Sequence, residues 1–380
     1  MRVGVLRSNA AAESGGGFTF EQELFDQLLL IAGESAHRFV VLDAPAELHR
    51  PTPANLEFAP TAPAPLHRLL RRVRRFRLDA LAADAGVDLI WNLSAGHPLT
   101  DTPFITVVWD LQHRLQPFFP EVSAEGQWST RERAFSVQVR RAAAIIAGTE
   151  VGRREIADFY QVPAARIHVL PQPTPRFALE AAASRPSLLD RFRLPQRYVF
   201  YPAQFWPHKN HRNLLEALAL LRGQGVELPL VLTGADKGNA RFVRGLVQKL
   251  GLERQVHMLG FVTVDELVAL YRSALCLGFV SLFGPENLPP LEAFALGCPV
   301  VAAEVAGARE QLGDAALLVD GTRPPLIAAA LRRLSEDAAL RAQLIARGSD
   351  RARRFTGKDF VRGVFGILDG LAPYLGCWRE

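Results

Sequence analysis

The chain has 380 residues, of which 49% are hydrophobic and 22% charged, and its formal net charge is +5 at pH 7. This composition is typical of a globular protein, and the length predicts about two domains. No apolar run reaches the ~18 residues that a membrane-spanning helix needs, and three cysteines are too few for a disulfide scaffold. The odd cysteine count and the short apolar stretch at the start predict a cytoplasmic location.

The first half of the chain alternates short apolar segments with amphipathic ones. The expected strands are Arg2–Leu6, Phe39–Leu42, Val87–Trp91, Phe104–Val108 and Ala144–Ala147, and the expected helices are Thr19–Ala32, Leu66–Ala83 and Ser129–Ala143. An alternation of this kind predicts βαβ units and a parallel sheet.

Three consecutive glycines, Gly15, Gly16 and Gly17, lie between the first expected strand and the first expected helix. Their backbone N–H groups can approach a phosphate or a sugar closely, although a flexible surface loop is an equally simple interpretation. The spacing does not match the G-x-G-x-x-G fingerprint of dinucleotide-binding proteins. The sequence therefore argues against hydride transfer with NAD.

Six arginines fall within the twelve residues of His67–Leu78. The apolar residues among them follow helical spacing, which leaves the arginines mostly on the opposite face. The helix Arg68–Arg77 has two interpretations: it docks on an anionic membrane surface, or it presents a solvated basic face. Nucleic-acid binding is not expected, because interleaved stacking aromatics and a reading motif are both missing.

The same alternation restarts in the second half of the chain. The expected strands there are Tyr198–Tyr201, Leu230–Thr233, Val256–Leu259, Ala274–Phe279, Pro299–Ala302 and Ala316–Val319. The proline-rich stretch Pro171–Pro195 between the halves predicts an interdomain linker. The predicted fold class is α/β, with two Rossmann-like doubly wound domains facing across a cleft. We expect an N-terminal domain over residues 1–180, a C-terminal domain over 181–357, and a helix over 358–380 that crosses back to the first domain.

The most informative segment is Phe283–Val301, which reads FGPENLPPLEAFALGCPVV. Two adjacent prolines suit the first turn of a helix, and Gly297 suits its C-terminal cap. Asn287 tolerates a left-handed backbone, so the preceding turn can direct successive N–H groups toward a bound anion. Glu292, in the first helical turn, can receive sugar hydroxyls. A phosphorylated, hydroxyl-rich ligand is therefore predicted.

This segment resembles the donor-site motif of retaining glycosyltransferases with the GT-B fold, in family 4, the mannosyltransferase-like group 1. The family motif has two glutamates eight positions apart. Glu292 matches the second glutamate, and the resemblance implies that it binds the nucleotide ribose while Asn287 and Leu288 lie against the diphosphate. The first glutamate would fall at Gly284. Glu286, two residues away, is the candidate for the missing catalytic carboxylate.

Lys209 lies in Tyr201–His211, after the first strand of the second half and just before an amphipathic helix. A lysine here can neutralise a diphosphate leaving group, and the simpler alternative is a surface lysine. The family has an arginine five positions earlier, where this chain has Gln204, which donates a hydrogen bond but brings no positive charge. The resemblance further implies that Gly234 approaches the diphosphate and that Val262 contacts the nucleotide base.

The segment Val107–Glu121 resembles the family's DLQH segment, which is common among its mannosyltransferase-like members. A histidine normally precedes the aspartate, whereas this chain has Trp109. The resemblance implies that Asp110 is catalytic and that Trp109 and His113 contact the acceptor or the sugar. His97 follows the strand that ends at Trp91, and this position predicts that it faces the same cleft. For His97 a structural role is the alternative.

The resemblance covers nearly the whole chain and also assigns Gly16 and Gly17 to donor binding, through the family's glycine-rich loop. It implies a retaining, metal-independent glycosyltransferase that moves a mannose-like sugar from a nucleotide-diphospho-sugar to a glycan or lipid-linked acceptor. No cofactor or metal is expected, because the chain has no DxD after a strand and no His/Cys ligand spacing. The natural setting would be polysaccharide biosynthesis at the inner face of the cytoplasmic membrane. Two alternatives stay open: an inactive donor-binding scaffold, and a nucleotide-sugar epimerase of the same fold.

Overall fold

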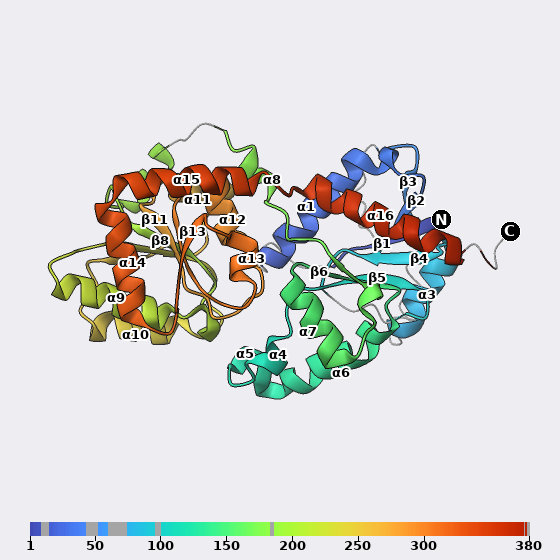
Figure 1. Ribbon diagram of the computed structural model, residues 1–380, viewed down its shortest axis with the longest axis horizontal. Helices are drawn as coiled ribbons and strands as arrows, with labels where there is room; N and C mark the ends of the chain where they lie inside the picture. The colour runs from blue at the N-terminus through green and yellow to red at the C-terminus, as the bar shows by residue number, and fades with distance from the viewer. Residues whose placement is uncertain are drawn as a thin grey trace. The chain divides into compact units, whose positions relative to one another are not determined.

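The computed structural model describes residues 1–8, 15–42, 52–59, 74–95, 100–182, 186–375 and 377. The chain divides into two compact units (Figure 1), each with its own parallel sheet. Unit 1 comprises Met1–Leu111, Trp128–Pro173 and Gly357–Glu380, and unit 2 comprises Gln112–Gln127 and Thr174–Thr356. Two α/β units of this kind agree with the predicted fold class.

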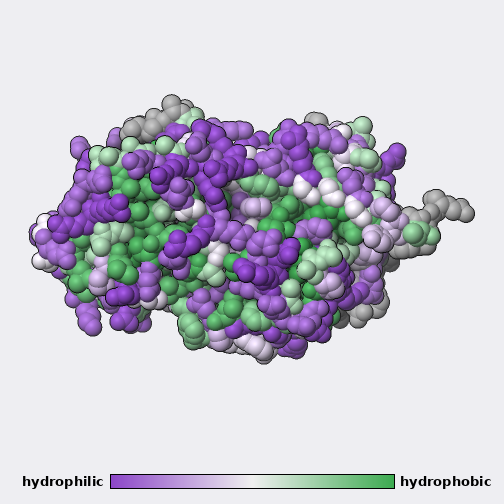
Figure 2. All heavy atoms as spheres, viewed as in Figure 1, coloured by the Kyte–Doolittle hydropathy of each residue, from purple (hydrophilic) through white to green (hydrophobic). Residues whose placement is uncertain are grey.

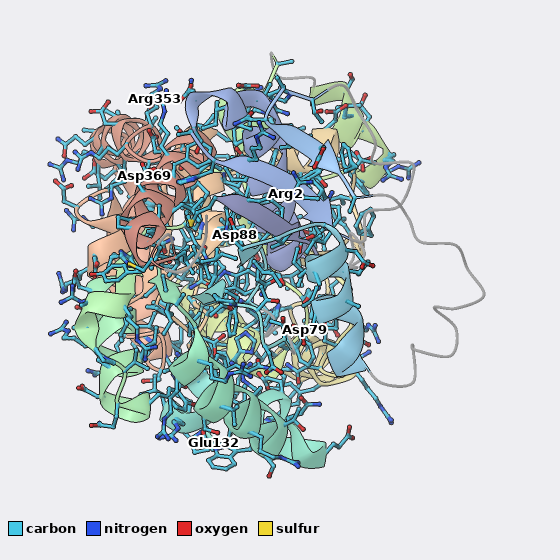
Figure 3. The ribbon with its side chains drawn as sticks, turned by 90° about the vertical axis from the view of Figure 1, so that its right-hand side faces the viewer. Arg2, Asp79, Asp88, Glu132, Arg353 and Asp369 are labelled. Atoms are coloured by element: carbon cyan, nitrogen blue, oxygen red, sulfur yellow. The ribbon has the colours of Figure 1, made fainter. Side chains whose placement is uncertain are left out.

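The sheet of unit 1 has, within the described residues, seven strands in the order β3-β2-β1-β4-β5-β6-β7. They are β1 (Arg2–Leu6), β2 (Arg38–Leu42), β3 (Leu56–Phe58), β4 (Leu89–Asn92), β5 (Phe104–Val108), β6 (Ala144–Ala147) and β7 (Ile167–Val169). The three strands β4, β5 and β6 are buried along their whole length, as continuous apolar runs predict for a parallel sheet covered on both faces. The Arg2 N–H donates to Asp88 Oδ2 at 2.7 Å, and Figure 3 shows these two residues near each other.

The helices of unit 1 include the last helix of the chain. They are α1 (Gly16–Ile31), α3 (Arg74–Asp84), α6 (Gln127–Arg141), α7 (Glu150–Tyr160) and α16 (Gly357–Leu375), with short 3-10 turns η2 (Ala32–Glu34) and η5 (Ala164–Arg166). Helix α16 buries an apolar face against α1, where the rings of Phe360 and Phe20 meet edge to face at 5.3 Å. The burial of this face is the physical reason that a segment so far along the chain folds with the first unit.

The sheet of unit 2 has, among the residues described, six parallel strands in the order β10-β9-β8-β11-β12-β13. They are β8 (Val199–Pro202), β9 (Leu230–Thr233), β10 (Val256–Met258), β11 (Cys276–Phe279), β12 (Val300–Ala303) and β13 (Ala316–Val319). The chain builds outward from β8 to one edge and then continues from β11 to the other. The carboxyl ends of β8 and β11 therefore form a topological switch point, where doubly wound sheets bind their ligands.

The structure describes the following helices in unit 2. They are α4 (Gln112–Leu115), α5 (Pro120–Ser123), α8 (Arg176–Leu179), α9 (His211–Gly223), α10 (Ala240–Lys249), α11 (Val264–Ser273), α12 (Leu288–Ala295), α13 (Ala308–Leu312), α14 (Pro324–Glu336) and α15 (Ala338–Ala352), with 3-10 turns η4 (Ala124–Gly126), η6 (Pro186–Phe192) and η7 (Pro207–Lys209). Helix α15 packs on α12 through Leu344, Gly348 and Ala352, spaced four residues apart, and hydrophilic side chains gather over its outer face (Figure 2). No described helix is both long enough and apolar enough to cross a membrane.

Several predicted elements have the observed boundaries, because short apolar runs between turn residues mark buried strands clearly. Strands predicted at Arg2–Leu6, Phe104–Val108, Ala144–Ala147, Leu230–Thr233 and Ala316–Val319 are confirmed to the residue. Strands β3 and β7 were not predicted: each has only three residues, and β3 borders a proline- and alanine-rich stretch. The predicted basic helix Arg68–Arg77 falls mainly outside the described residues, where only the backbone of Arg74–Arg77 is described.

The end of α12 follows the prediction and its beginning does not. Gly297 has a left-handed φ of 73°, its N–H donates to Phe294, and the Cys298 N–H donates to Ala293 at 2.8 Å. These two bonds form the predicted glycine cap. Asn287, expected to be left-handed, instead has an extended backbone with φ −148°. Its position explains the difference, because a residue that precedes the first helical turn adopts the β region.

The segment Gln112–Gln127 belongs to unit 2, although the predicted domain boundaries assign it to the first domain. Its side chains bond to unit 2 rather than to the sheet that it follows: Gln116 Nε2 donates to the Leu282 carbonyl at 2.8 Å, and Glu121 binds His208. The chain passes from unit 1 to unit 2 again at Pro173 and returns at Gly357. No periodicity in the sequence signals such an excursion, because it depends on contacts between residues far apart in the chain.

Candidate functional site

The candidate site of unit 2 lies where the loops after β8, β9 and β11 meet. Most of the predicted donor-site residues follow these strands or the N-terminus of α12. Because carboxyl ends of parallel strands share one edge of the sheet, residues spread from Gln204 to Glu292 in sequence come together there.

Lys209 is held by its neighbours in a defined loop. The next residue, Asn210, is left-handed with φ 58° and ψ 34°, which ends the turn η7 and begins α9. The Tyr201 hydroxyl donates to the Lys209 carbonyl at 2.7 Å. The Lys209 Nζ lies 3.5 Å from the Ser281 Oγ, to which it donates. The ammonium group is therefore fixed beside the loop that follows β11.

The positive charge of this loop comes from Lys209 and not from His211. The His211 ring is buried, stacked on Phe205 at 4.8 Å and tilted against Tyr201 at 5.1 Å. Burial, followed by the nearby charge of Lys209, lowers its pKa to about 3. The ring is thus neutral at physiological pH and acts as an aromatic spacer under the loop.

Gln204, which stands where the family has an arginine, has a defined amide orientation. The Trp206 indole Nε1–H donates to the Gln204 Oε1 at 2.9 Å. Because an indole nitrogen can only donate, this bond assigns the oxygen end of the amide to Trp206. The other end is the NH₂ group, which is the end that a phosphate oxygen requires.

Gly234 is a glycine because backbone crowds it. Its φ is 134°, and a Cβ atom there would lie 2.5 Å from the Ala203 carbonyl oxygen. Its N–H donates to the Gly260 carbonyl at 3.0 Å, which ties the loop after β9 to the loop after β10, two residues before Val262. The loops predicted to approach the diphosphate and the base are therefore joined directly.

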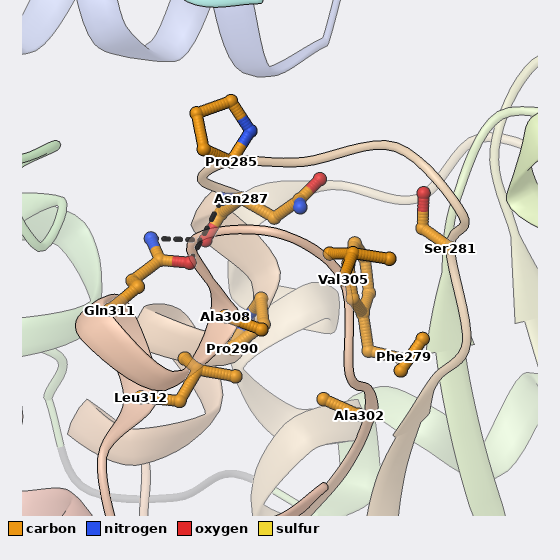
Figure 4. A pocket seen from close by; sticks show the side chains of 11 residues that line it. Phe279, Ser281, Pro285, Asn287, Pro290, Ala302, Val305, Ala308, Gln311 and Leu312 are labelled. Carbon is orange, nitrogen blue, oxygen red and sulfur yellow. Dashed lines mark hydrogen bonds between the residues drawn. The ribbon is translucent and has the colours of Figure 1, made fainter. Parts of the chain in front are cut away.

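The beginning of α12 offers fewer anion-binding donors than its helical geometry suggests. The Asn287 N–H donates to Gln311 Oε1, and Gln311 Nε2 donates back to the Asn287 carbonyl, both at 3.0 Å (Figure 4). Pro289 and Pro290 have no N–H. Leu288 is therefore the residue of this helix start whose N–H can meet a diphosphate, whereas the Asn287 N–H is already used.

Glu292 is the fifth residue of α12 and so lies beyond the first helical turn, where the sequence predicted it, because the helix begins at Leu288. It is buried, with 8% of its surface exposed. The Tyr271 hydroxyl donates to Glu292 Oε2 at 2.7 Å. Burial raises the pKa of this carboxyl to about 7, in spite of the hydrogen bond from Tyr271, which acts in the opposite direction. A half-ionised carboxylate in such a position is typical of functional sites.

Gly284 stands where the family motif has its first glutamate, and the structure leaves no room for a side chain there. A Cβ atom at Gly284 would lie 2.5 Å from the Ala306 carbonyl oxygen and 3.1 Å from the Val305 side chain. The backbone of this loop therefore differs from one that carries a side chain at this position. Glu286, half-buried two residues further on, remains the candidate for the carboxylate function.

The segment Gln112–Gln127 contacts the loop after β8 and the loop after β11. Gln112 Nε2 donates to the Gly284 carbonyl at 3.2 Å. Glu121 Oε1 accepts from the His208 N–H at 3.0 Å and lies 2.5 Å from His208 Nδ1, which lowers the pKa of the Glu121 carboxyl despite its burial. The His208 ring stacks on Phe283 at 3.9 Å. His113, predicted to contact the sugar, is completely buried in this segment.

In unit 1 the structure brings together the predicted residues that follow β1 and β5. The Trp109 ring fills the space over Gly17, where a Cβ atom would lie 3.0 Å from the indole Cη2. Asp110 pairs with Arg131 at 2.5 Å.

Burial, and then the charge of Asp110, raise the pKa of Glu155 on α7 to about 7. Gly16 is exposed at the start of α1, and His97 lies outside the described residues.

Four contact residues were missed by sequence reasoning: Tyr271, Gln311, Glu121 and Glu155. Only Tyr271 had a sequence signal, because the capping box Thr263–Glu266 marks the start of its helix α11. Among the residues that the structure describes, no three His, Cys, Asp or Glu side chains are grouped so that they could hold a metal ion.

Two family models match the chain. "Glycosyl transferases group 1" matches residues 190–351, and "Glycosyltransferase Family 4" matches residues 26–175. The two matches lie in different halves of the chain, so its similarity to glycosyltransferases extends over both units.

Curated relatives show the same similarity. The chain is 28% identical over 243 residues to the O-antigen chain mannosyltransferase B of Escherichia coli, a match that covers 63% of this chain and 64% of that protein. Other curated relatives are matched over smaller shares of their length, such as 31% and 51%.

The structural likenesses extend over nearly the whole chain. Sucrose-phosphate synthase from Thermosynechococcus elongatus superposes with a TM-score of 0.74 at 18% identity, covering 98% of this chain and 100% of that one. The Anabaena protein HepE, solved in complex with UDP-glucose, gives a TM-score of 0.69 at 18% identity over the same shares of the two chains. At this identity the likeness establishes the GT-B fold alone.

The crowding at Gly284 leads to a stability prediction. Replacing Gly284 by Ala should lower the free energy of unfolding by about 1–3 kcal/mol, because the new Cβ meets a backbone carbonyl that cannot rotate away. Gly245→Ala on α10 is the matched control, since no atom lies within 4 Å of its Cβ position, and it should stabilise slightly. Chemical denaturation measures both. Equal stability of the Gly284→Ala variant and the wild type would contradict the crowding.

The buried Glu292 leads to a pH prediction. An acid whose pKa is raised from 4.5 to about 7 on folding keeps its proton in the folded state while the unfolded state releases it. Stability therefore falls as pH rises from about 4.5 to about 7, by at most about 3 kcal/mol. Glu292→Gln should remove this fall and so exceed the wild type in unfolding temperature at pH 8 but not at pH 4.5. A constant difference across this range would show that the carboxyl does not titrate as described.

Proposed function

We propose that this protein is a retaining, metal-independent glycosyltransferase that uses a nucleotide-diphospho-sugar. It transfers the sugar, with a mannose-like sugar favoured, to a hydroxyl group of a glycan or lipid-linked acceptor. The matches to two glycosyltransferase family models support the reaction class. The observation that carries the proposal is the meeting of a fixed ammonium, Lys209, with the loop between β11 and α12, whose helix holds the buried carboxyl Glu292.

The proposed site has a division of labour along the donor. Glu292 accepts hydrogen bonds from the ribose hydroxyls, and the backbone at Val262 contacts the base. Lys209, the Gln204 NH₂ group and the Leu288 N–H stabilise the departing diphosphate, the lysine by its charge and the other two by hydrogen bonds, with Gly234 allowing close backbone approach. A lysine with an amide replaces a lysine–arginine pair, so one full positive charge is missing from this arrangement.

The proposed reaction needs no separate acid and base. The acceptor hydroxyl attacks the anomeric carbon from the face that the diphosphate leaves, and its proton passes to a diphosphate oxygen, so that the bond to the sugar breaks as the new one forms. Glu286, and Asp110 with its Arg131 partner, are the proposed further catalytic groups. Gly16, Gly17, Trp109, His113 and His97 are proposed to contribute to donor, sugar or acceptor contacts.

The donor sugar and the membrane contact are supported by different observations. The similarity to an O-antigen mannosyltransferase supports mannose and polysaccharide synthesis, whereas a structural neighbour was solved with UDP-glucose. Peripheral contact with an anionic membrane through Arg68–Arg77 is proposed from sequence alone, because that helix lies mainly outside the described residues.

Nucleotide-sugar binding tests the proposal first. GDP-mannose and UDP-glucose should be compared by thermal shift, each with and without EDTA. A ligand that binds only the folded state at a hundredfold excess over Kd stabilises by about 2.7 kcal/mol. We expect a shift with one of the two that EDTA leaves unchanged. Loss of the shift on chelation would contradict metal independence.

Turnover with the stabilising donor separates the alternatives. Lys209→Ala should slow release of the nucleoside diphosphate by about 10²–10³-fold, as expected when one transition-state donor is removed. Lys249→Ala, an exposed lysine at the end of α10, is the matched control and should leave the rate unchanged. Binding without diphosphate release by the wild type, on any of a panel of hydroxyl acceptors, would favour the donor-binding scaffold. No shift with either donor would overturn the proposal.

A further inference from the structure

The hydrogen bond between Tyr271 and Glu292 fixes the carboxyl that the proposed function assigns to the ribose. Tyr271 is completely buried in the last turn of α11, and its hydroxyl is 2.7 Å from Glu292 Oε2 and 3.3 Å from the Pro289 carbonyl oxygen. Helix α11 is itself fixed at its start, where Thr263 and Glu266 form a capping box. The tyrosine therefore has little freedom to turn away from Glu292.

We propose that Tyr271 is a positioning residue for nucleotide binding: it holds one oxygen of Glu292, so that the other oxygen, Oε1, faces the ribose hydroxyls in the ionised, accepting state. This inference rests on the proposed function. Among the described residues, Tyr271 is the one side chain that hydrogen-bonds this carboxyl. A ligand hydroxyl that reaches Glu292 therefore meets Oε1.

The Tyr271 hydroxyl has one proton and two acceptors within reach, Glu292 Oε2 and the Pro289 carbonyl oxygen. When Glu292 is ionised, the hydroxyl donates to Oε2, the closer acceptor and the charged one. When Glu292 is protonated on Oε2, the carboxyl donates to the tyrosine oxygen, and the tyrosine proton turns to the Pro289 carbonyl. The protonation state of Glu292 thus decides whether Tyr271 supports an accepting carboxylate or a neutral acid.

Two thiols also lie beside Glu292 in the fold, Cys276 on β11 and Cys298 directly after α12. Burial raises the pKa of the Cys276 thiol to about 12 and that of Cys298 well above its ordinary value. The other charged residues on the helices packed against α12 are Arg176 on α8 and Arg341, Arg347, Asp350 and Arg351 on α15.

The proposal makes nucleotide binding pH-dependent with a definite sign. An ionised carboxylate accepts hydrogen bonds from two ribose hydroxyls more strongly than a neutral acid does. Since the pKa of Glu292 is about 7, affinity should rise as pH increases through this value. The Tyr271 bond favours the ionised form, so its removal should move the rise to higher pH.

The test compares Tyr271→Phe with Tyr198→Phe. Tyr198 is the matched control, because it is equally buried and its hydroxyl donates to the Leu270 carbonyl at 2.8 Å, away from Glu292. Isothermal titration with GDP-mannose and with UDP-glucose, from pH 5.5 to 8.5, gives the affinity of each variant. We expect Tyr271→Phe to bind roughly tenfold more weakly at pH 7, with its rise shifted to higher pH. Tyr198→Phe should keep the wild-type profile even where it lowers stability.

A second measurement needs no ligand. The unfolding temperature of the free wild-type protein should fall with rising pH. In Tyr271→Phe this fall should extend to higher pH. When Glu292→Gln is already present, adding Tyr271→Phe should cause no such change. A pH profile unaffected by Tyr271→Phe would overturn the coupling. A changed stability profile with unchanged affinity would overturn the positioning role. If the wild type shows the coupling but binds neither donor, the proposed function fails and the Tyr271–Glu292 coupling stands, with no ribose to position.

If Tyr271→Phe does not fold, Glu292→Gln alone decides the ligand part of the proposal. Its nucleotide affinity should be weaker than that of the wild type at pH 8 and should not vary from pH 5.5 to 8.5. An unchanged rise of affinity with pH in this variant would place the titrating group elsewhere and overturn the proposal.

Discussion

The side-chain amide of Asn210 holds the candidate site together. It is buried, and its Nδ2 donates to the Val280 carbonyl at 3.0 Å and to the Gly321 carbonyl at 2.7 Å. One side chain thus connects the loops after β8, β11 and β13. The position of Lys209, one residue earlier, depends on this connection and on the left-handed backbone that Asn210 tolerates. A site built at a sheet edge needs such ties, because each loop is otherwise connected only to its own strand and helix.

Close backbone packing explains why this site departs from its family pattern. At Gly284 and at Gly307 a side-chain carbon would meet the backbone of the facing loop at 2.5 Å. A glutamate at position 284 is incompatible with this arrangement, so its absence belongs to the shape of the loop as much as to the chemistry of the site. The carboxyl that remains fixed is Glu292, and it is retained although its burial opposes ionisation. A buried carboxyl with a raised pKa is typical of functional sites.

The segment Gln112–Gln127 shows how distant parts of the sequence share one site. It leaves the first sheet after β5, and its glutamines donate to carbonyls of the loop Leu282–Gly284. Its Glu121 meanwhile pairs with His208 beside Lys209. The DLQH resemblance ends within this segment, at Gln112 and His113. The partners that give it a structural role become visible only in the folded unit.

The sequence by itself determined the two parallel sheets, the boundaries of the most buried strands, the glycine cap of α12 and the resemblance to glycosyltransferases. These features depend on local hydrophobic pattern and local backbone preference, which a single stretch of chain carries within itself. It also singled out Lys209 and Glu292 through their motifs. Only the tertiary structure decided that Asn287 is extended and bound to Gln311, that Gly284 admits no side chain, and that Tyr271 meets Glu292. Each of these depends on an atom supplied by a segment distant in sequence, and burial by the whole unit sets the charge of Glu292.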